Sequence, residues 1–198
     1  MAAYRAPVAR AEAEIREKGS VFLARLAPAG REEDARAFLA EVSREHPDAT
    51  HHCWAWRLGP QPHERSSDAG EPGGTAGVPM LQVLRGAGLA DVVVVVVRWY
   101  GGTNLGKGGL ARAYAGAVRA AVADIATEQR VPTVSLTLEV PYEKIGAVKR
   151  LIHPPKVELR SESYGATARL VLTVWETEAA TLEAALGDLA LTPDVSRE

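Results

Sequence analysis

Six consecutive valines, at residues 92–97, constrain the fold of this chain more than any other feature of its sequence. Branching at Cβ favours extended backbone over helix, so the run predicts a β-strand within residues 91–98. Side chains alternate between the two faces of a strand, and here both faces are apolar. Such a strand is typical of the centre of a sheet that is covered on both sides. The run is also far shorter than the roughly 18–20 apolar residues that a membrane span needs.

Patterns typical of strands and helices alternate along the first 130 residues. They predict a strand at 21–26, a helix at 31–45, a strand at 50–58, a short apolar turn at 80–84 and a helix carried by apolar residues from 110 to 125. Residues 59–79 show no periodicity and are rich in glycine and proline, which predicts a long loop. Loops of that length within compact domains are often functional.

A second unit is predicted to follow a boundary at Val131 and Pro132. The patterns indicate a strand at 135–140, a helix at 142–152, a hairpin of strands at 156–162 and 166–175, and a helix capped by Thr177 that runs to about residue 190. This β-α-β-β-α order suggests a ferredoxin-like arrangement, although no closing strand is evident in 191–198. The chain is therefore predicted to be α+β, with domains at 1–130 and 131–198.

Charge and cysteine content exclude several classes of protein. The 198 residues include 23 Lys and Arg and 25 Asp and Glu, a net charge of −2, so any contact with nucleic acid has to come from a local patch. The single cysteine excludes a disulfide framework and any zinc site with several cysteines from one chain. Charged residues near the N-terminus interrupt any signal-peptide core, so the cytoplasm is the expected compartment and no membrane partner is expected. The oligomeric state stays open.

A glycine-rich turn between the valine strand and the next helix is the strongest candidate for chemistry. Its spacing, with Gly101 and Gly102 before Gly106, Lys107 and Gly108, reproduces most of a phosphate-binding P-loop. Gly108 stands where a P-loop needs the Ser or Thr that holds Mg²⁺, so the pattern fails as an NTPase signature. Backbone N–H groups and Lys107 at a helix N-terminus would still suit an anion.

The segment from 92 to 123 contains four basic residues, Arg98, Lys107, Arg112 and Arg119, and no acidic one. Arg112 and Arg119 are seven positions apart and therefore share a face of the predicted helix. Together with the glycine turn, these residues predict a surface that contacts phosphates. The alternative is a solvated helix face beside glycines that only make a tight turn.

Three polar residues near the end of the predicted loop, Asp68, Glu71 and Thr75, form a second candidate site. The carboxylates suit a general base or a cation, and the threonine offers a hydroxyl partner. The alternative is a turn in which Asp68 and Thr75 only hydrogen-bond the local backbone. Catalysis is the less favoured interpretation, because neither a metal cage nor a clear base accompanies these residues.

Histidines and tryptophans after residue 50 suggest two further sites, and neither is favoured. His51 and His52 are adjacent and point to opposite faces of a strand, which leaves at most His51 and Cys53 for a metal, so no metal site is predicted. Trp54 and Trp56 share a face and would suit base stacking. Covering the core is the commoner role of such a pair, and it is the preferred interpretation.

Taken together, these motifs resemble the hallmark of the IMPACT family, which includes the bacterial YigZ-type proteins. The resemblance is strong over about residues 15–126 and weak over 131–198. It rests on PDATHHCWA at 47–55, SDAGEPGGTAGVP at 67–79, VVVVVVRWYGG at 92–102 and LGKGGL at 105–110. The family's usual second acidic residue is Ala69 here, which weakens a paired-carboxylate or metal site at Asp68.

The resemblance implies a first domain of the α+β type found in domain 2 of ribosomal protein S5. It also implies a ferredoxin-like second domain, similar to the C-terminal domain of translocating elongation factors. Eukaryotic members of the family regulate translation initiation under starvation, through a partner of an initiation-factor kinase. They use an added N-terminal interaction domain that this chain is expected to lack, so the resemblance points to translation without that partner.

The leading hypothesis is a non-catalytic, translation-associated protein of the cytoplasm that binds RNA or a ribosome-associated factor and needs no cofactor. Its phosphate contacts are predicted to come from one basic, glycine-rich stretch: Arg98, Gly101, Gly102, Gly106, Lys107, Gly108, Arg112 and Arg119. The alternative is an enzyme acting on a phosphorylated small molecule, with the phosphate held by the loop 101–109 and Lys107, and with Asp68 or Glu71 as base. A protein-interaction module is the third hypothesis.

Overall fold

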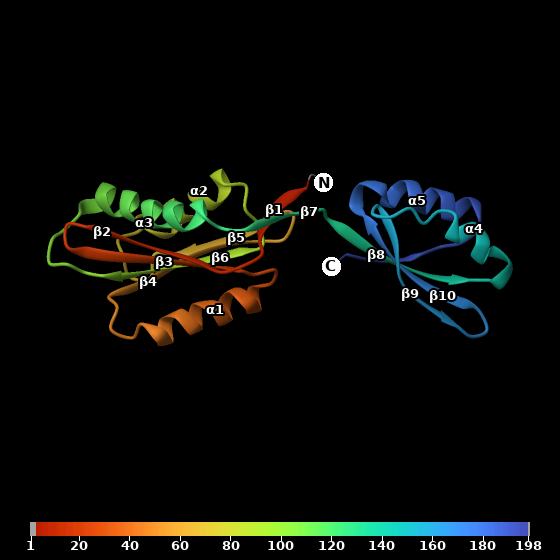
Figure 1. Ribbon diagram of the computed structural model, residues 1–198, viewed down its shortest axis with the longest axis horizontal. Coiled ribbons are helices and arrows are strands. Elements are labelled where there is room, and N and C mark those ends of the chain that lie inside the picture. The colour runs from red at the N-terminus through yellow and green to blue at the C-terminus, as the bar shows by residue number, and fades with distance from the viewer. Residues whose placement is uncertain (1–2, 198) are drawn as a thin grey trace. The chain divides into compact units, whose positions relative to one another are not determined.

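The structure, a computed structural model, describes residues 3–197 and divides into two compact units, one of Tyr4–Arg130 and one that begins at Val131. The first unit is built on a five-stranded antiparallel sheet with the strand order β2-β3-β6-β4-β5 (Figure 1). Its strands are β2 (Ala11–Glu17), β3 (Ser20–Pro28), β4 (His51–Leu58), β5 (His63–Ser67) and β6 (Val92–Trp99). Within residues 3–197, no helix is long and apolar enough to cross a membrane.

The valine strand is the centre of this sheet, as predicted. β6 lies between β3 and β4, and all six valines at 92–97 are fully buried. The even-numbered valines pack into one core cluster and the odd-numbered valines into another, because alternate side chains point to opposite faces. One apolar strand without alternation therefore serves two separate hydrophobic cores.

Helices cover both faces of the sheet, which makes the first unit a three-layer structure (Figure 1). The helix predicted at 31–45 is confirmed as α1 (Glu32–Glu45), which packs on one face over β4 and β6. On the other face lie α2 (Gly77–Gly86) and α3 (Gly106–Ala123), which contact each other and the strands beneath them. The loop that carries Asp68, Glu71 and Thr75 leads into α2, and the glycine turn leads into α3.

The two tryptophans of β4 belong to the core beneath α1. Trp56 is fully buried, and Trp54 stacks on it with ring centroids 4.2 Å apart. The guanidinium of Arg36 in α1 also covers Trp56, with its Cζ atom 5.8 Å from the ring centroid. The preference for a core role over a base-stacking platform is therefore confirmed.

Two elements occupy the stretch that the sequence predicts as a long loop and a short turn. β5 lies within 59–79, and α2 extends across the turn predicted at 80–84. β5 is an edge strand, and its polar sequence HERSS lacks the apolar alternation that identifies a strand against a core. α2 is ten residues long and carries Pro79 in its first turn, where a missing N–H leaves no helical hydrogen bond unmade. β5 therefore forms because it pairs with β4, and α2 forms because it packs on α3. Local sequence patterns reveal neither element.

Three further strands of the first unit were not predicted. β2 reads AEAEIRE, in which charged residues alternate with Ala and Ile at an exposed sheet edge. β1 (Tyr4–Pro7) and β7 (Thr127–Arg130) pair with each other as a small antiparallel sheet. β1 and β7 are only four residues long, so each is too short to show a period of its own.

The second unit has the element order β-α-β-β-α-β and a four-stranded antiparallel sheet with the order β11-β8-β10-β9. Its elements are β8 (Thr133–Val140), η1 (Tyr142–Lys144), α4 (Ile145–Lys149), β9 (Val157–Tyr164), β10 (Ala168–Trp175), α5 (Glu176–Asp188) and β11 (Asp194–Arg197). A single core cluster joins the inward faces of the strands to α4 and α5.

Three details of the second unit differ from the predictions. A closing strand does exist, because β11 pairs with β8; it is four residues long and mostly polar, so no apolar pattern marks it. The helix predicted at 142–152 is a 3-10 turn followed by a short α-helix that ends at Lys149. The N-cap of α5 is Trp175 and not Thr177, because the helix starts directly where β10 ends.

Candidate functional site

A pocket of about 590 Å³ in the first unit brings together the segments that carry the sequence motifs. Its walls come from the start of β4, the loop before α2, the end of β6 and the start of α3. Its polar and aromatic lining includes His51, Glu71, Arg98, Tyr100, Asn104 and Lys107. These residues span more than fifty positions, so only the folding of the sheet places them around one cavity.

An ion pair between Glu71 and Arg98 is buried in the wall of this pocket. The two side chains are 3% and 6% exposed, and Nη1 of Arg98 lies 2.5 Å from Oε1 of Glu71. The hydroxyl of Tyr114 donates to the same oxygen at 2.6 Å. Nη2 of Arg98 has one long contact of 3.5 Å to Oγ of Ser20, and its Nε has no partner within residues 3–197. Because Glu71 neutralises it, Arg98 contributes little net charge to the pocket, and its contact with phosphate stays a prediction.

Behind this ion pair, Tyr114 and Cys53 form a fully buried polar cluster. Sγ of Cys53 lies 3.3 Å from the hydroxyl oxygen of Tyr114 and 2.9 Å from the carbonyl oxygen of Asp68. Burial raises the pKa of the Cys53 thiol to about 12, against the opposing effect of the Tyr114 hydroxyl. Burial likewise raises the pKa of Tyr114, and Cys53 adds to the shift. Both groups hold their protons at neutral pH, so neither is an activated nucleophile.

The imidazole of His51 lines the pocket in a fixed orientation. Its Nδ1 lies 3.0 Å from the carbonyl oxygen of Ala69, which only accepts, so Nδ1 carries a proton. In the neutral ring Nε2 is then an acceptor, 3.9 Å from Oε2 of Glu71. Cys53, its neighbour on the same face of the strand, is buried in the cluster behind Glu71. In the described part of the chain, no three His, Cys, Asp or Glu side chains gather as metal ligands.

Asp68 and Thr75 hold the backbone of the loop before α2. The carboxylate of Asp68 accepts hydrogen bonds from three backbone N–H groups around the start of that helix, at 2.8, 2.8 and 2.9 Å. Burial acts to raise the pKa of Asp68, but these three donors outweigh it and the pKa is lowered. The hydroxyl of Thr75 donates to the carbonyl oxygen of Pro72 at 2.6 Å. This geometry supports the interpretation in which both residues organise a turn.

The glycine turn keeps the length of a P-loop up to Lys107, but it is partly built for close packing. α3 begins at Gly106, whose φ of +68° favours glycine. A Cβ atom on Gly101 would lie 1.9 Å from the carbonyl carbon of Gly19, so no side chain fits there. Gly101 therefore allows two backbone segments to meet, whereas a Cβ atom on Gly102 or Gly108 would meet no backbone within 4 Å.

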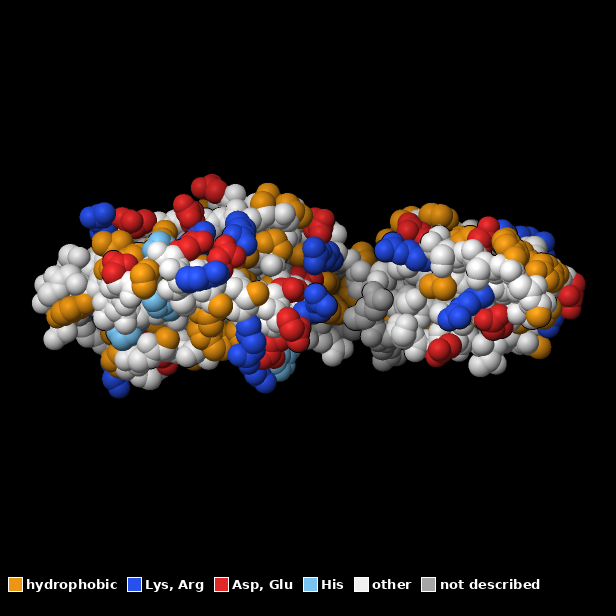
Figure 2. Space-filling view, turned by 90° about the horizontal axis from the view of Figure 1, so that it is seen from below, with side chains coloured by type: hydrophobic (Ala, Val, Ile, Leu, Met, Phe, Trp, Pro, Cys, Tyr) orange, Lys and Arg blue, Asp and Glu red, His pale blue; other side chains and the backbone are white. Residues whose placement is uncertain are grey.

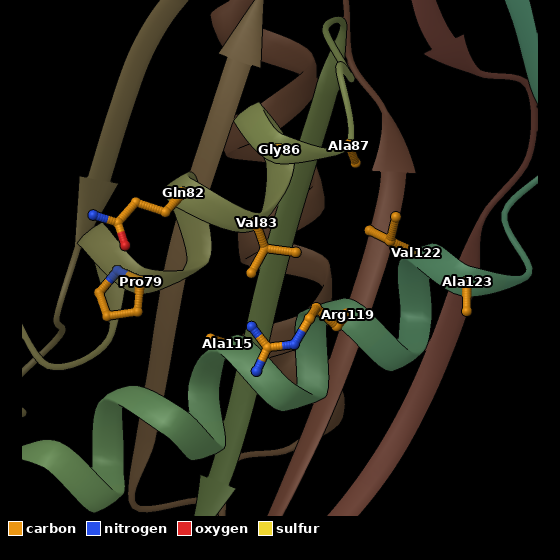
Figure 3. Close-up of a pocket in the computed structure, with 9 residues that line it drawn as sticks. All are labelled: Pro79, Gln82, Val83, Gly86, Ala87, Ala115, Arg119, Val122 and Ala123. Atoms are coloured by element: carbon orange, nitrogen blue, oxygen red, sulfur yellow. The ribbon is translucent and has the colours of Figure 1, made fainter.

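The three basic residues of α3 are exposed and unpaired. Lys107, Arg112 and Arg119 form no ion pair with any residue from 3 to 197. Arg119 lines a separate hollow of about 410 Å³ between α2 and α3, which Figure 3 shows with Val83 and Val122 around it. The structure thus brings Lys107 to the same pocket as the buried ion pair and places Arg119 at another.

Tyr100, Asn104 and Tyr114 are residues of the site that no sequence motif singled out for chemistry. Tyr100 is 46% exposed, and its hydroxyl lies 3.3 Å from Oδ1 of Asn104. The helical pattern assigns Tyr114 only to an apolar stripe, and nothing local reveals its hydrogen bond to Glu71. The signal that points to Tyr100 and Asn104 is their place beside the glycine turn, where a tight backbone leaves large side chains exposed.

Comparison with known proteins identifies the relatives of this chain. The family described as the Impact N-terminal domain matches residues 18–122. An IMPACT family member of Haemophilus influenzae is 40% identical over 179 residues, which cover 89% of this chain and 87% of the relative. IMPACT family member YigZ of Escherichia coli is 38% identical over 176 residues, which cover 87% and 86%. A crystal structure of a hypothetical protein is 35% identical with a TM-score of 0.73, and covers 100% of this chain and 99% of that chain.

The pocket lies wholly within the matched domain. Residues 18–122 include every residue that lines it, from Thr50 to Leu110. The second unit lies outside this domain, but the two bacterial relatives match most of the chain at 38–40% identity. The resemblance inferred from the motifs is therefore confirmed, and this chain belongs to the IMPACT family.

Proposed function

We propose that this chain is a non-catalytic, translation-associated protein of the cytoplasm that binds RNA through α3 and the glycine turn before it. The observation that carries the proposal is the row of exposed cations Lys107, Arg112 and Arg119, which have no carboxylate partner within residues 3–197. Cations that are not neutralised inside the protein are available to phosphates. The chain as a whole has a net charge of −2, so this local row is the feature that selects a polyanion.

The cations of α3 lie along the helix but not on one face of it. With a rise of about 1.5 Å and a turn of about 100° per residue, Arg112 and Arg119 share a face about 10.5 Å apart along the axis, whereas Lys107 lies about 7.5 Å before Arg112 and about 140° around the helix from it. Lys107 stands in the first turn of α3, where unpaired backbone N–H groups and the helix dipole add positive potential. No acidic residue between 92 and 123 cancels it. Phosphates passing along α3 would therefore meet one sign of charge.

Family membership and the two-unit architecture support a role in translation. The family resemblance implies that eukaryotic members regulate initiation. It also implies an S5 domain-2-like first domain and a ferredoxin-like second domain, and we adopt both assignments in this proposal. The β-α-β-β-α-β order of the second unit, with its sheet order β11-β8-β10-β9, supports the second of them.

Co-sedimentation of the full chain with ribosomes and total RNA, with and without nuclease, tests the proposal. Binding is expected to fall steeply between about 50 and 300 mM KCl. Association releases counterions from the RNA phosphates, and added salt opposes this release. Lys107→Ala with Arg112→Ala should weaken binding and lower the salt slope by about two, one for each side chain that no longer meets a phosphate.

The matched control removes the same charge from the opposite face of the sheet, through Arg36→Ala with Arg65→Ala. Both arginines already form ion pairs with Glu32, so this variant should bind as the parent chain does. Salt-insensitive binding, or equal losses in the two variants, would overturn the proposal. A partner that stays bound after nuclease treatment would indicate a protein-interaction module instead.

The pocket favours a second candidate, an enzyme that acts on a phosphorylated small molecule. A cavity of about 590 Å³ lies in the size range of small-ligand sites. Lys107 would hold the phosphate, but the two predicted bases are already engaged, Asp68 by backbone N–H groups and Glu71 by Arg98. A screen of phosphorylated metabolites for phosphate release or transfer tests it. Activity that Asp68→Asn or Glu71→Gln abolishes, in a variant that is still folded under the assay conditions, would support the enzyme, and a flat screen would exclude the substrates screened.

A further inference from the structure

We infer that the pocket between β4, β6 and α3 holds one nucleotide of a single-stranded RNA, with its base stacked on Tyr100 and its phosphate at Lys107. The inference rests on the proposed function and deepens it, because it names the part of the RNA that enters the protein. It also predicts that binding depends on the presence of bases, which the row of cations on α3 does not require. The pocket's volume of about 590 Å³ is within the range that encloses small ligands of this size.

Tyr100 supplies an aromatic surface that is already held in place. The side chain is 46% exposed on the pocket wall, although Cζ of Arg98 lies 5.5 Å from its ring centroid. Its hydroxyl makes a long contact of 3.3 Å to Oδ1 of Asn104. A large ring that lies against a buried cation and a neighbouring side chain has less freedom to lose when a base stacks on it. Unpaired bases of RNA characteristically stack on such exposed aromatic side chains.

Asn104 and His51 offer hydrogen bonds to the edge of a base. Asn104 engages Tyr100 through Oδ1, and its amide nitrogen has no partner within residues 3–197. In the neutral ring of His51, Nε2 is an acceptor, because Nδ1 donates to the carbonyl oxygen of Ala69. One donor and one acceptor on the same pocket match the mixed donors and acceptors of a nucleobase edge.

The charge of the pocket favours a nucleotide within a strand over a free mononucleotide. Glu71 and Arg98 neutralise each other at 2.5 Å, which leaves Lys107 as the one Lys or Arg of the lining that has no carboxylate partner within residues 3–197. One positive charge matches the single negative charge of a phosphodiester. The phosphate of a free mononucleotide carries close to two negative charges at pH 7 and would be incompletely neutralised. The next cations along α3 would then meet the phosphates of neighbouring nucleotides.

Fluorescence anisotropy with a labelled single-stranded RNA of about ten nucleotides tests the inference. Tyr100→Leu should weaken binding by about tenfold, and Tyr100→Phe should retain most of the affinity, because phenylalanine keeps the ring. The side chain is nearly half exposed, so both variants should unfold at the same urea concentration as the parent chain. A Tyr100→Phe loss as large as that of Tyr100→Leu would overturn the stacking role.

A second probe separates the base from the backbone. An abasic strand of the same length should bind the parent chain about tenfold more weakly than the intact RNA, and should bind Tyr100→Leu as strongly as it binds the parent. If intact and abasic strands bind the parent equally, the inference fails. The proposed function then survives only if binding stays salt-sensitive and Lys107→Ala still weakens it. If neither strand binds at about 50 mM salt, the proposed function fails as well.

Adenosine monophosphate, used as a competitor, distinguishes a nucleotide within an RNA strand from a free mononucleotide. It should displace the labelled RNA only at concentrations far above those of an unlabelled strand. If the mononucleotide displaces the RNA at an equal or lower concentration, and if Tyr100→Leu abolishes this displacement, the pocket binds free nucleotides and not a nucleotide within an RNA strand.

Discussion

The two faces of the first sheet carry arginines and lysines in very different states. On the α1 side most arginines pair: Arg10 with Glu41, Arg25 with Glu45, and both Arg36 and Arg65 with Glu32, while Arg44 has no carboxylate partner within residues 3–197. Figure 2 shows this side, where blue and red side chains are interspersed. Along α3 on the other side, the three cations have no carboxylate partner within residues 3–197. The two surfaces therefore differ less in how many cations they carry than in whether the protein has already neutralised them.

The largest effect should come from breaking the ion pair beneath the pocket. Glu71→Ala would leave Arg98 buried without its counter-ion, which should lower the free energy of unfolding by about 3–5 kcal/mol. Urea unfolding followed by tryptophan fluorescence measures it. Replacing both residues, with Glu71→Gln and Arg98→Met, should recover much of the loss. A single-variant loss below about 1 kcal/mol would show that water reaches the guanidinium after all.

A smaller loss should follow from Asp68→Ala, which removes the acceptor of three backbone N–H groups. We expect about 1–3 kcal/mol at pH 7, because these are hydrogen bonds to a charged group. Since the folded pKa of Asp68 is lowered, its contribution is complete above the ordinary value of 3.8 and disappears as the pH falls through the folded pKa. Unfolding curves of the parent and the variant should therefore converge at low pH. A difference that is constant from pH 7 to pH 2 would contradict this cause.

An added carboxylate would make a cation of α3 resemble the paired arginines of the α1 side. Gly108→Glu places an acid four residues before Arg112, the spacing that favours an ion pair on a helix. A Cβ atom at Gly108 would lie 3.5 Å from Nη1 of Arg112 and meet no backbone, so the side chain fits. RNA affinity should fall by about tenfold with no cation removed, and the salt slope should drop by about one. Gly108→Gln is the uncharged control and should bind as the parent does.

The smallest effect should come from the paired face. Arg36→Ala removes a partner of Glu32; the Arg36 side chain is 60% exposed, and water screens such pairs strongly. RNA affinity should not change beyond experimental error, and stability should fall only by the contact of Arg36 with Trp56, about 0.5–1 kcal/mol. A clear loss of RNA affinity would mean that the α1 face takes part in binding and that an arginine with a carboxylate partner can still contact RNA.

Local patterns predicted those elements whose signal lies within a few consecutive residues. The valine strand and α1 show a continuous apolar run and a helical apolar stripe, and both are confirmed. β5 and β11 were missed because an edge strand that is mostly exposed needs no apolar alternation. Their existence depends on the neighbouring strands β4 and β8, which supply the missing hydrogen bonds.

The candidate site likewise has features that the sequence shows and features that only the structure shows. The glycine turn, Lys107 and the absence of acids from 92 to 123 are visible in the sequence, because each concerns adjacent positions. The same stretch makes Arg98 look equivalent to the cations of α3, which the structure shows it is not. Tyr114 likewise reads as an ordinary apolar position until its hydroxyl is found 2.6 Å from Glu71.

The central strand, the family motifs and the charge of α3 follow directly from the residue types at consecutive positions. Which of the charges remain free depends on how the chain folds. Glu71 lies 27 residues before Arg98, and the packing of its loop against β6 brings carboxylate and guanidinium to 2.5 Å. Burial and ion pairing are properties of residues that meet in space, so folding decides that Arg98 is neutralised while Lys107, in the same pocket, has no carboxylate partner within residues 3–197.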